Sequence, residues 1–425
     1  MLLPDLYKIY LQYPSIQTDT RKVQRDDFFF ALKGPNFNGN LFALQALENG
    51  AAFCIIDEAI EGMNEKMILV DDVLSTLQEL ARHHRETFTI PIIAITGSNG
   101  KTTTKELVSA VLTSHFKTAT TEGNLNNHIG VPLTILKIKK DTEIAVIEMG
   151  ANHQKEIESY CRYTQPTHAI ITNCGKAHLE GFGGVEGVRK GKGELFDYIR
   201  AHDGMAFIFN DYDYLLEMSA GIQKKFSYST SVGDVVGHVE KSEPFLSVAI
   251  KEDLKTAVIK TALVGDYNLP NVLCAVAVGK YFAVPEEKMI AAIENYTPSN
   301  SRSQLVQLGS NQIILDAYNA NPSSMKAAIE NFAKMQVHPK VLMIGGMMEL
   351  GNDSVQEHEQ IVQLIQQFKW DEVVLVGGDF GKLRHPFLFL ADSDAARLWY
   401  DTQKFENTYL LVKGSRSMQM EKIIS

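Results

Sequence analysis

The chain has 425 residues, more than one hydrophobic core usually serves, so we expect two or three domains. Its 51 acidic residues outnumber its 41 lysines and arginines, and the formal net charge of −10 argues against a general surface for nucleic acid or acidic membranes. With 45% hydrophobic and 22% charged residues, the composition is that of a globular protein rather than a disordered chain.

The cysteines and the amino terminus bear on where the protein works. The four cysteines are scattered and form no CxxC pair, which argues against a disulfide framework or a cysteine-rich zinc site. The first residues lack a charged segment leading into an apolar stretch, and no apolar run reaches the roughly 20 residues that span a bilayer. We therefore expect a soluble cytoplasmic protein without membrane insertion, and we expect it to act as a monomer.

Residues 1–88 contain short apolar runs around one helical pattern. The runs FFFALKG and AAFCIID are typical of strands, and LFALQALENG between them is typical of a helix. This segment is therefore predicted to form a small α/β domain.

The next region opens with the apolar run IPIIAIT, a glycine-rich turn and the helical pattern KTTTKELVSAVLTSH. This order predicts the strand, turn and helix that open a nucleotide-binding sheet. Further buried-strand candidates are IAVIEM, HAIITN and AFIFN, which indicate a largely parallel sheet covered on both faces. We predict a central domain over residues 89–298.

The third region begins at a turn-rich stretch, YTPSN at residues 296–300, which we interpret as a linker. Beyond it, helical patterns alternate with the strand candidates IILDAY, VLMIGG, EVVLVGG and YLLVKG. Strands that alternate with helices predict a second doubly wound α/β domain, over residues 299–425.

The stretch TGSNGKTTT, residues 96–104, is the most informative in the chain. Its glycines let backbone N–H groups point at phosphate oxygens, next to the positive end of the following helix. Lys101 would neutralise the β- and γ-phosphates, and the Thr102 hydroxyl would be a Mg²⁺ ligand. The strict pattern GxxxxGK[ST] fails because Ile95 stands where it requires glycine, so an ordinary turn is the alternative. The intact GKT half favours nucleotide binding, which a switch protein, a kinase or a ligase would equally need.

Seven segments, in the same order along nearly the whole chain, resemble motifs of the Mur ligases of peptidoglycan synthesis: TGSNGKTTTKE, TEGNLNNHIGVPLTIL, IEMGANHQKEI, ITNCGKAHLEGFGGVEGVRKGKGELF, GDYNLPNVLCAVAVG, DAYNANPSSM and MMELG. The resemblance implies an amino-terminal domain for a UDP-sugar, a central P-loop-like ATPase domain and a Rossmann-like carboxy-terminal domain. GKTTTKE and YNANP are most similar to the member that joins D-alanyl-D-alanine to UDP-MurNAc-tripeptide. That resemblance implies an ATP-dependent ligase that works through an acyl phosphate.

The resemblance implies which residues hold ATP. The phosphate loop would surround the triphosphate, with Lys101 and Arg302 as catalytic cations. The other implied ATP contacts are Gly97, Ser98, Asn99, Gly100, Thr102, Thr103, Asn268, Asn271, Asp316 and Tyr318. Asn268 and Asn271 could instead cap the start of a helix, and Arg302 could be a surface residue of the linker. Asp316 and Tyr318 could belong to an ordinary strand-to-helix turn at DAYNANP.

The resemblance also implies Mg²⁺, as two ions. The implied ligands are Thr102, Glu148, His178 and Lys192. Lys192 lies in RKGKGELF, similar to the family segment in which a lysine reacts with CO₂ to form a carbamate, and His178 and Lys192 are also implied in catalysis. The alternatives are a solvent-facing acid at 148, a structural histidine at 178 and a solvated basic helix face at 192, with Lys190 as the alternative register.

Contacts to the UDP-linked substrate are implied in the first domain and in two later loops. DTR and ALKG resemble family segments that hold the uridine diphosphate. The implied residues are Thr20, Arg21, Lys33, Asn124, Asn126, Asn127, Asn152 and His153. Turn formation is the alternative for the asparagine-rich loops. The chain departs from the family pattern at Asn38, Asn40, Leu41, Leu315 and Gly346, which puts substrate contacts in question rather than the phosphate loop.

Two other functions compete with this ligase. One is a relative that joins another amino acid to another carboxylate, such as a folylpolyglutamate-synthase-like enzyme, and the UDP-contact segments argue against it. The other is a nucleotide-gated binding protein, which would not need a carbamate-supported second metal.

Overall fold

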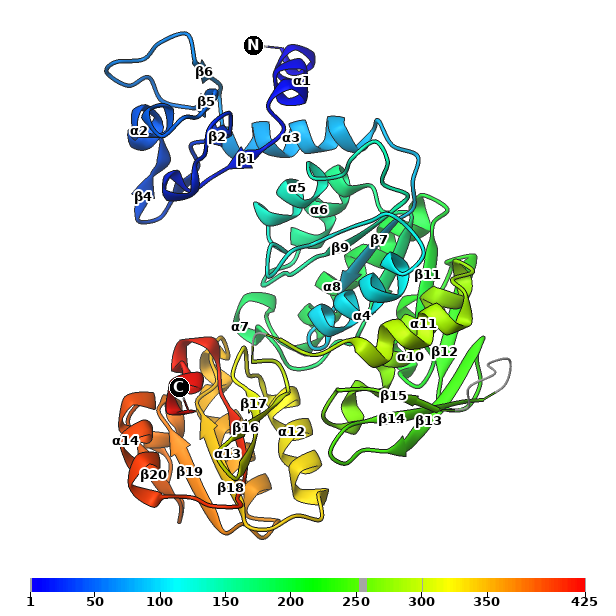
Figure 1. Cartoon of the computed structure of the whole chain (residues 1–425), viewed down its shortest axis with the longest axis vertical. Helices are drawn as coiled ribbons and strands as arrows, with labels where there is room; N and C mark the ends of the chain where they lie inside the picture. The colour runs from blue at the N-terminus through cyan, green and yellow to red at the C-terminus, as the bar shows by residue number, and fades with distance from the viewer. Residues whose placement is uncertain (1, 252–257, 300, 425) are drawn as a thin grey trace. The chain divides into compact units, whose positions relative to one another are not determined.

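A computed structural model describes residues 2–251, 258–299 and 301–424, and Figure 1 shows its helices and strands. The chain divides into two compact units. The first comprises Met1–Ala94, Phe116–Gly150 and Glu156–His168, and the second comprises Ile95–His115, Ala151–Lys155 and Ala169–Ser425. The domain boundaries near residues 88 and 299 stay predictions, and Asn300 of the predicted linker lies outside the described residues.

The amino-terminal part of the first unit is a small parallel sheet with helices. The sheet has the order β1-β2-β5-β6, and a separate antiparallel hairpin pairs β3 with β4. The strands are β1 Ile16–Gln17, β2 Phe28–Phe30, β3 Lys33–Gly34, β4 Phe37–Asn38, β5 Phe53–Ile56 and β6 Met67–Leu69. The helices are α1 Leu3–Gln12, α2 Ala43–Glu48 and α3 Val73–Arg85, with short 3-10 turns η1 Thr20–Lys22 and η2 Gly39–Phe42. The predicted strands FFFALKG and AAFCIID and the helix between them are confirmed as β2, β5 and α2.

The largest sheet has nine strands in the order β15-β14-β13-β12-β11-β10-β7-β9-β8. They are β7 Ile92–Thr96, β8 Thr118–Thr120, β9 Ile144–Glu148, β10 His168–Ile171, β11 Met205–Phe209, β12 Lys224–Ser229, β13 Val235–Lys241, β14 Ser247–Lys251 and β15 Val258–Lys260. The predicted strands IPIIAIT, IAVIEM, HAIITN and AFIFN are confirmed as β7, β9, β10 and β11. The prediction missed β12 to β15, of which β14 pairs antiparallel with both of its neighbours.

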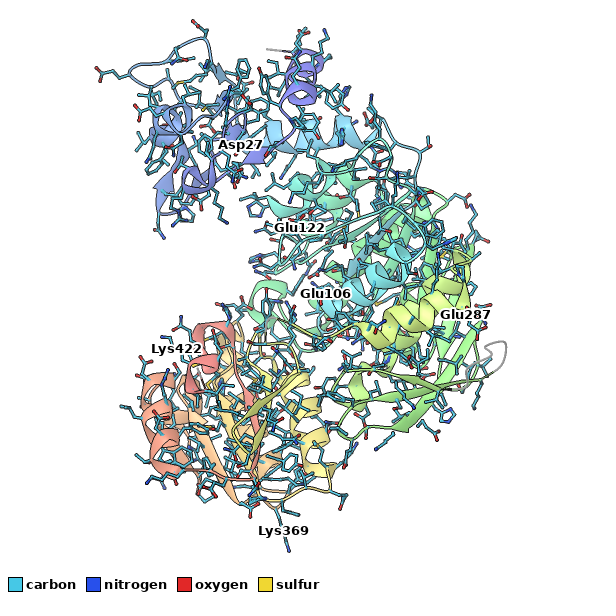
Figure 2. The ribbon with its side chains drawn as sticks, viewed as in Figure 1. Asp27, Glu106, Glu122, Glu287, Lys369 and Lys422 are labelled. Carbon is cyan, nitrogen blue, oxygen red and sulfur yellow. The ribbon has the colours of Figure 1, made fainter. Side chains whose placement is uncertain are left out.

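Helices cover this sheet and connect its strands. They are α4 Lys101–Thr113, α5 Gly130–Ile135, α6 Glu156–Thr164, α7 Leu179–Phe182, α8 Val185–Ala201, α9 Asp213–Met218, α10 Leu269–Tyr281 and α11 Glu286–Asn295. Glu106, labelled in Figure 2, lies on α4 and accepts a hydrogen bond from the hydroxyl of Tyr296. The first residue of the predicted linker is therefore fixed to the helix that follows the phosphate loop.

The carboxy-terminal part of the second unit has a six-stranded sheet in the order β16-β17-β21-β18-β19-β20. Its elements are β16 Gln304–Leu308, β17 Asn311–Asp316, α12 Pro322–Lys334, β18 Lys340–Gly345, α13 Ser354–Ile365, β19 Glu372–Val376, β20 Leu388–Leu390, α14 Ser393–Gln403 and β21 Tyr409–Lys413. Only the β16–β17 pair is antiparallel among these described strands. The predicted α/β class and the doubly wound pattern of this part are confirmed.

Apolar faces of strands and helices meet in the core of each part. Ile313, Met343 and Val412, from three neighbouring strands, are almost fully buried in the carboxy-terminal core. Burial of such side chains stabilises each by about 1.5 to 3 kcal/mol. In the described residues, none of the helices combines the length and apolar character that crossing a bilayer requires.

Candidate active site

The phosphate loop runs from the end of β7 at Thr96 to the start of α4 at Lys101. Gly97 and Gly100 have φ angles of 144° and 78°, which side chains other than glycine rarely adopt. A Cβ atom at residue 97 would lie 2.0 Å from the hydroxyl of Thr172. These two positions therefore require glycine, and the loop brings its backbone amides to the start of a helix, where anions bind.

Lys101 folds back over this loop. Its Nζ donates hydrogen bonds to the carbonyl oxygens of Gly97, at 2.7 Å, and Ser98, at 3.3 Å. Thr102 is buried at the start of α4, and Thr103 is partly exposed. The lysine charge is thus held over the loop, as the predicted phosphate site requires.

The segment after β10 supports the loop from the other side. The backbone N–H of Ser98 donates a hydrogen bond to the carbonyl oxygen of Asn173, at 2.9 Å. The backbone N–H of Asn99 donates to the side-chain oxygen of the same residue, at 3.0 Å. The Thr172 hydroxyl donates to the carbonyl of Asn99 at 2.6 Å. Sequence reasoning missed both supporting residues, although the polar end of HAIITN was a signal for them.

Asn268 and Asn271 lie at the start of α10 and are buried. Asn271 accepts a hydrogen bond from the hydroxyl of Thr104 and donates one to Asn268, at 3.0 and 2.8 Å. The Asn268 side chain donates to the carbonyl of Val264 and does not cap the helix. Side-chain capping by Asn268, one of the alternatives, is therefore wrong, and Asn271 instead joins α10 to the helix of the phosphate loop.

His178 precedes α7 in the left-handed conformation, with φ 52°. Its Nδ1 lies 2.5 Å from Oε2 of Glu349, and hydrogen bonding to the imidazole lowers the pKa of that glutamate. Lys176, in the same loop, forms an ion pair with buried Glu357 at 2.6 Å. Neither glutamate was predicted, because each lies far from its partner in sequence.

Lys192 is buried inside α8, whereas Lys190 on the same helix is exposed. The Nζ atom of Lys192 donates a hydrogen bond to the carbonyl oxygen of Ala151, at 3.0 Å. The same atom lies over the Phe182 ring, 4.9 Å from the ring centroid. The solvated-face alternative is therefore wrong for residue 192. An ammonium group over the face of an aromatic ring makes a cation–π contact.

Arg302, Asp316 and Tyr318 gather at the carboxyl end of β17. The Arg302 guanidinium lies over the Tyr318 ring, 3.4 Å from its centroid. Asp316 accepts a hydrogen bond from the backbone N–H of Ser303 and forms an ion pair with Lys413. Asn321, the N-cap residue of α12, donates from its side chain to Asn99 of the phosphate loop at 2.7 Å.

In the first unit, Glu148 ends β9 and is fully buried. The solvent-facing alternative for this acid is therefore wrong. Its Oε1 accepts a hydrogen bond from the side chain of Asn126 at 2.7 Å. Asn127 accepts the backbone N–H groups of Ile129 and Gly130 and so has the turn role that was its alternative, while Asn124 is exposed.

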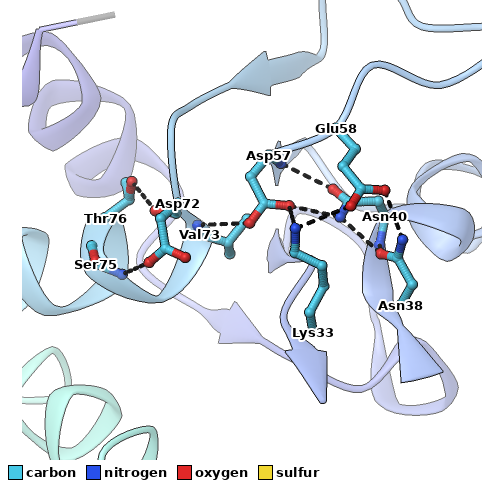
Figure 3. Close-up of polar contacts among 9 residues, drawn as sticks. All are labelled: Lys33, Asn38, Asn40, Asp57, Glu58, Asp72, Val73, Ser75 and Thr76. Carbon is cyan, nitrogen blue, oxygen red and sulfur yellow. Dashed lines mark hydrogen bonds and ion pairs between the residues drawn. The ribbon is translucent and has the colours of Figure 1, made fainter. Parts of the chain in front are cut away.

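Figure 3 shows a charged network around Lys33 in the amino-terminal part. Lys33 Nζ lies 3.0 Å from Asp57 and 3.1 Å from Glu58, and hydrogen bonds to these carboxylates raise its pKa. The side chains of Asn40 and Asn38 donate to the same two acids at 2.7 Å each. The two asparagines that depart from the family pattern thus hold the counter-charges of the lysine.

The remaining predicted substrate residues lie in short turns, where Thr20 is half-buried and the others are exposed. The Arg21 side chain pairs with Asp19, and this hydrogen bonding lowers the pKa of Asp19 to about 2. Thr20 accepts a hydrogen bond on its carbonyl from Asn49. Asn152 and His153 are exposed. Among the other departures, Leu41 is exposed, Leu315 is buried in the core, and Gly346 packs against Gly378.

The four predicted Mg²⁺ ligands offer mostly oxygen atoms as donors. In the part of the chain that the structure describes, no three histidine, cysteine, aspartate or glutamate side chains gather to hold a metal ion. The predicted set does not need such a cluster, because Thr102 supplies a hydroxyl and Lys192 would supply a carbamate. Mg²⁺ prefers oxygen donors, which residues 102, 148 and a carbamylated 192 would supply, whereas an imidazole is a less usual ligand for it. The burial of Glu148 fits a ligand rather than a surface acid.

Three family models match the chain in succession. They are described as the Mur ligase family catalytic domain, over residues 12–85, the Mur ligase middle domain, over residues 95–279, and the Mur ligase glutamate ligase domain, over residues 301–415. The UDP-N-acetylmuramoyl-tripeptide–D-alanyl-D-alanine ligase of Bacillus subtilis is 34% identical, over 96% of this chain and 92% of the relative. The chain belongs to the Mur ligase family. The corresponding ligase of Escherichia coli is 33% identical over the same shares.

Solved structures of Mur ligases have the same fold as this chain. MurF from Acinetobacter baumannii has a TM-score of 0.87 and 31% identity, over 96% of this chain and 92% of that one. MurF from Thermotoga maritima, in complex with ADP, has a TM-score of 0.83 and 25% identity, over 97% and 96%. A folylpolyglutamate synthase from Mycobacterium tuberculosis, at 16% identity and a TM-score of 0.60, shares the fold alone. The three-domain Mur ligase architecture predicted from the motifs is confirmed.

Proposed function

We infer that this Mur ligase joins D-alanyl-D-alanine to UDP-MurNAc-tripeptide in an ATP-dependent, ADP-forming reaction, the last cytoplasmic step of peptidoglycan precursor synthesis. The observation that carries this inference is the similarity, over 96% of the chain, to the Bacillus subtilis and Escherichia coli ligases of that name. The glycine loop with Lys101 folded over it supports the use of ATP.

The reaction has two steps. The terminal carboxylate of the tripeptide attacks the γ-phosphorus of ATP, the bond from that phosphorus to ADP breaks, and an acyl phosphate forms. The amine of D-alanyl-D-alanine then attacks the acyl carbon, loses a proton and displaces inorganic phosphate, leaving an amide. Activation is needed because oxide is a poor leaving group and phosphate is a good one.

Positive charge must shield the two anions that meet in the first step. We assign Lys101 to the β- and γ-phosphates and Arg302 to the γ-phosphate, with the backbone of Gly97 to Gly100 around the phosphates. Asn268, Asn271, Asp316 and Tyr318 remain proposed contacts of the base and ribose. The stacking of Arg302 on Tyr318 supports this grouping, because it brings the two residues together at one strand end.

Mg²⁺ would supply further charge, and its proposed ligands are Thr102, Glu148, His178 and carbamylated Lys192. The burial of Lys192 supports carbamylation at that residue rather than at Lys190, which is exposed. Thr20, Arg21 and Lys33 are proposed for the uridine diphosphate, and the loops at 124–127 and 152–153 for the sugar and peptide. We propose that the enzyme works as a monomer in the cytoplasm.

Phosphate release from ATP tests the reaction. We expect turnover only when UDP-MurNAc-tripeptide and D-alanyl-D-alanine are both present. Phosphate release that does not depend on the dipeptide would favour a nucleotide-gated binding protein. Phosphate release with folate and glutamate as substrates would favour a folylpolyglutamate-synthase-like enzyme. Either result would contradict the proposed ligase.

Substitution of Lys192 tests the carbamate. Lys192→Ala is expected to lose activity and to recover part of it in bicarbonate or short-chain carboxylic acids, which can restore an anionic ligand. Lys190→Ala is the matched control, because it removes an exposed lysine from the same helix, and it should keep its activity. Unchanged activity of Lys192→Ala would show that the assignment is wrong.

A further inference from the structure

A buried histidine on α13 holds the backbone that follows β18. The backbone N–H of Met347 donates a hydrogen bond to Nε2 of His358 at 3.0 Å, and both residues are almost fully buried. We propose that His358 is a positioning residue, which as a neutral imidazole holds the MMELG segment, residues 347–351, in place for the ligase reaction. This inference rests on the proposed function, because it takes the loop of His178, which the segment contacts, to belong to the active site.

The two hydrogen bonds of the His358 ring fix its protonation state. A backbone N–H can only donate, so Nε2 accepts from Met347 with its lone pair and carries no proton. Nδ1 lies 2.7 Å from the carbonyl oxygen of Ser354, which can only accept, so the ring proton is on Nδ1. A second proton on Nε2 would point at the N–H of Met347 and remove that hydrogen bond. Only the neutral ring therefore makes both contacts.

The surroundings of the ring favour this neutral form. Burial lowers the pKa of His358 and outweighs the hydrogen bond to α13, which acts in the opposite direction. The charged groups that act on the ring are Asp379 and Lys382, from the turn after β19, and Glu357, its neighbour on α13. The two acids raise the pKa and the lysine lowers it, so their effects partly cancel. The Phe380 ring packs edge-on against the imidazole, with 4.6 Å between the centroids.

The backbone just before Met347 is already fixed by the two neighbouring strands. The N–H of Gly346 donates to the carbonyl oxygen of Val376, the last residue of β19, at 2.9 Å. The carbonyl oxygen of Gly346 accepts the N–H of Ser415, which follows β21, at 3.2 Å. A Cβ atom at residue 346 would lie 2.6 Å from the Cα of Gly378. His358 therefore extends this anchoring by one residue, to the point where the chain leaves the sheet.

The anchored segment meets the loop that contains His178. Oε2 of Glu349 lies 2.5 Å from Nδ1 of His178, and the carbonyl oxygen of Glu349 accepts the backbone N–H of Glu180 at 3.4 Å. Glu349 has a left-handed φ angle of 62°, a conformation that persists where surrounding contacts determine it. A shift of the backbone at Met347 would therefore move the contacts of a proposed catalytic loop, and small displacements around a site are costly in rate.

Two isosteric substitutions separate the two hydrogen bonds of the ring. In His358→Gln the amide can reach the place of Nε2, where its oxygen can still accept from Met347. In His358→Asn the amide can reach only the place of Nδ1, where it can still donate to Ser354 but leaves the Met347 N–H without an acceptor. The pair therefore tests the hold on Met347 while a polar side chain of similar size stays in the buried position.

Amide hydrogen exchange of the full-length protein, followed by mass spectrometry of the peptide that contains Met347, measures this hold without substrates. We expect exchange in this peptide to be about tenfold faster in His358→Asn than in the wild type, and close to the wild-type rate in His358→Gln. Glu359→Gln, at an exposed glutamate on the same helix, is the control and should match the wild type.

Steady-state kinetics with ATP and both substrates links the hold to the reaction. At pH 7.5 we expect kcat to fall about tenfold or more in His358→Asn and much less in His358→Gln. Between pH 7.5 and pH 5.5 the kcat of the wild type should fall more steeply than that of His358→Gln, because glutamine cannot take up the proton that breaks the bond to Met347. A merely structural role would lower the urea midpoints of both variants and would not order their kcat values in this way.

The outcomes separate this inference from the proposed function. If the wild type turns over with both substrates and the Met347 peptide exchanges equally in His358→Asn and wild type, the positioning role is overturned and the ligase stays intact. Equal kcat values for these two proteins, or a parallel loss of kcat with pH in His358→Gln and wild type, would overturn it as well. Wild-type protein that releases no phosphate with both substrates would overturn the proposed function, and the positioning role with it.

Discussion

Asp316 and Lys413 are directly opposite each other on the neighbouring parallel strands β17 and β21, and their side chains form an ion pair of 2.5 Å. The side chain of Lys413 is 2% exposed and that of Asp316 is 16% exposed. Lys413 also donates to the carbonyl of Asn319, and Ser303 donates to the second oxygen of Asp316. The carboxylate proposed to meet the ribose is therefore held by a buried cation and a backbone amide.

Removing one member of this pair should destabilise the carboxy-terminal part more than removing both. Lys413→Met leaves the Asp316 charge enclosed without its cation, and we expect the free energy of unfolding to fall by about 3 kcal/mol. Asp316→Asn in the same chain should recover part of that loss. Urea unfolding followed by tryptophan fluorescence measures this locally, because Trp370 and Trp399 both lie in that part. Strictly additive effects of the two substitutions would argue against a coupled pair.

The limits of sequence reasoning are visible in this same pair. The strands that contain Asp316 and Lys413 were both predicted, because IILDAY and YLLVKG are apolar runs bounded by turns. Their pairing was not predicted, because β21 is the last strand in sequence yet lies between β17 and β18. Strand order and register depend on how the whole chain packs, and no local pattern encodes them.

In the candidate active site, too, local features could be predicted from the sequence and long-range contacts could not. The phosphate loop could be predicted, since its geometry depends on glycines and a lysine that are close in sequence. The contact of Glu349 with His178 could not, because only folding brings the two residues together. Asn173 was marked by the polar end of its strand, but its contact with the phosphate loop was not. Strands β12 to β15 were missed for another reason. β13 has mixed burial along its length, so its residues lack the continuous apolar run that marked the central strands.

Gly100 should be needed for ATP binding because of both its backbone and its surroundings. A Cβ atom there would lie 2.7 Å from Oδ1 of Asn271, and the φ angle is 78°. We expect Gly100→Ala to displace the loop and to raise the KM for ATP about tenfold or more. Gly309→Ala is the matched control, because its φ is 60° but nothing lies within 4 Å of the added carbon. Equal KM values for the two variants would show that the space next to Asn271 is not limiting.

Lys33 should contribute to binding of the UDP-linked substrate rather than to stability. We expect Lys33→Ala to raise the KM for UDP-MurNAc-tripeptide about tenfold with little change in kcat, because a phosphate contact worth about 1.4 kcal/mol is lost. Glu58→Gln should lower that KM, since it removes one of the two carboxylates that oppose the lysine charge. Lys8→Ala, at an exposed lysine of α1, is the control. A KM that moves in the same direction for Lys33→Ala and Glu58→Gln would contradict this account.

Stability should fall as the pH falls below about 6.5, because neutral histidines are buried. Burial lowers the pKa of His168 from 6.5 to about 4, and it also lowers the pKa values of His84 and His358. Between these pKa values the unfolded chain binds a proton that the folded protein does not. The stability that neutral His168 contributes is therefore complete above pH 6.5 and is lost progressively down to about pH 4.

For His168 the difference corresponds to about 3 kcal/mol at the acid end of that range. His168→Gln cannot take up the proton, so its urea midpoint should depend less on pH than that of the wild type. Circular dichroism of urea unfolding at pH 7.5, 6.5, 5.5 and 4.5 would measure both slopes. His128→Gln, at an exposed histidine, should leave the slope unchanged. If His168→Gln and the wild type lost stability in parallel over this range, other groups would have to carry the acid sensitivity.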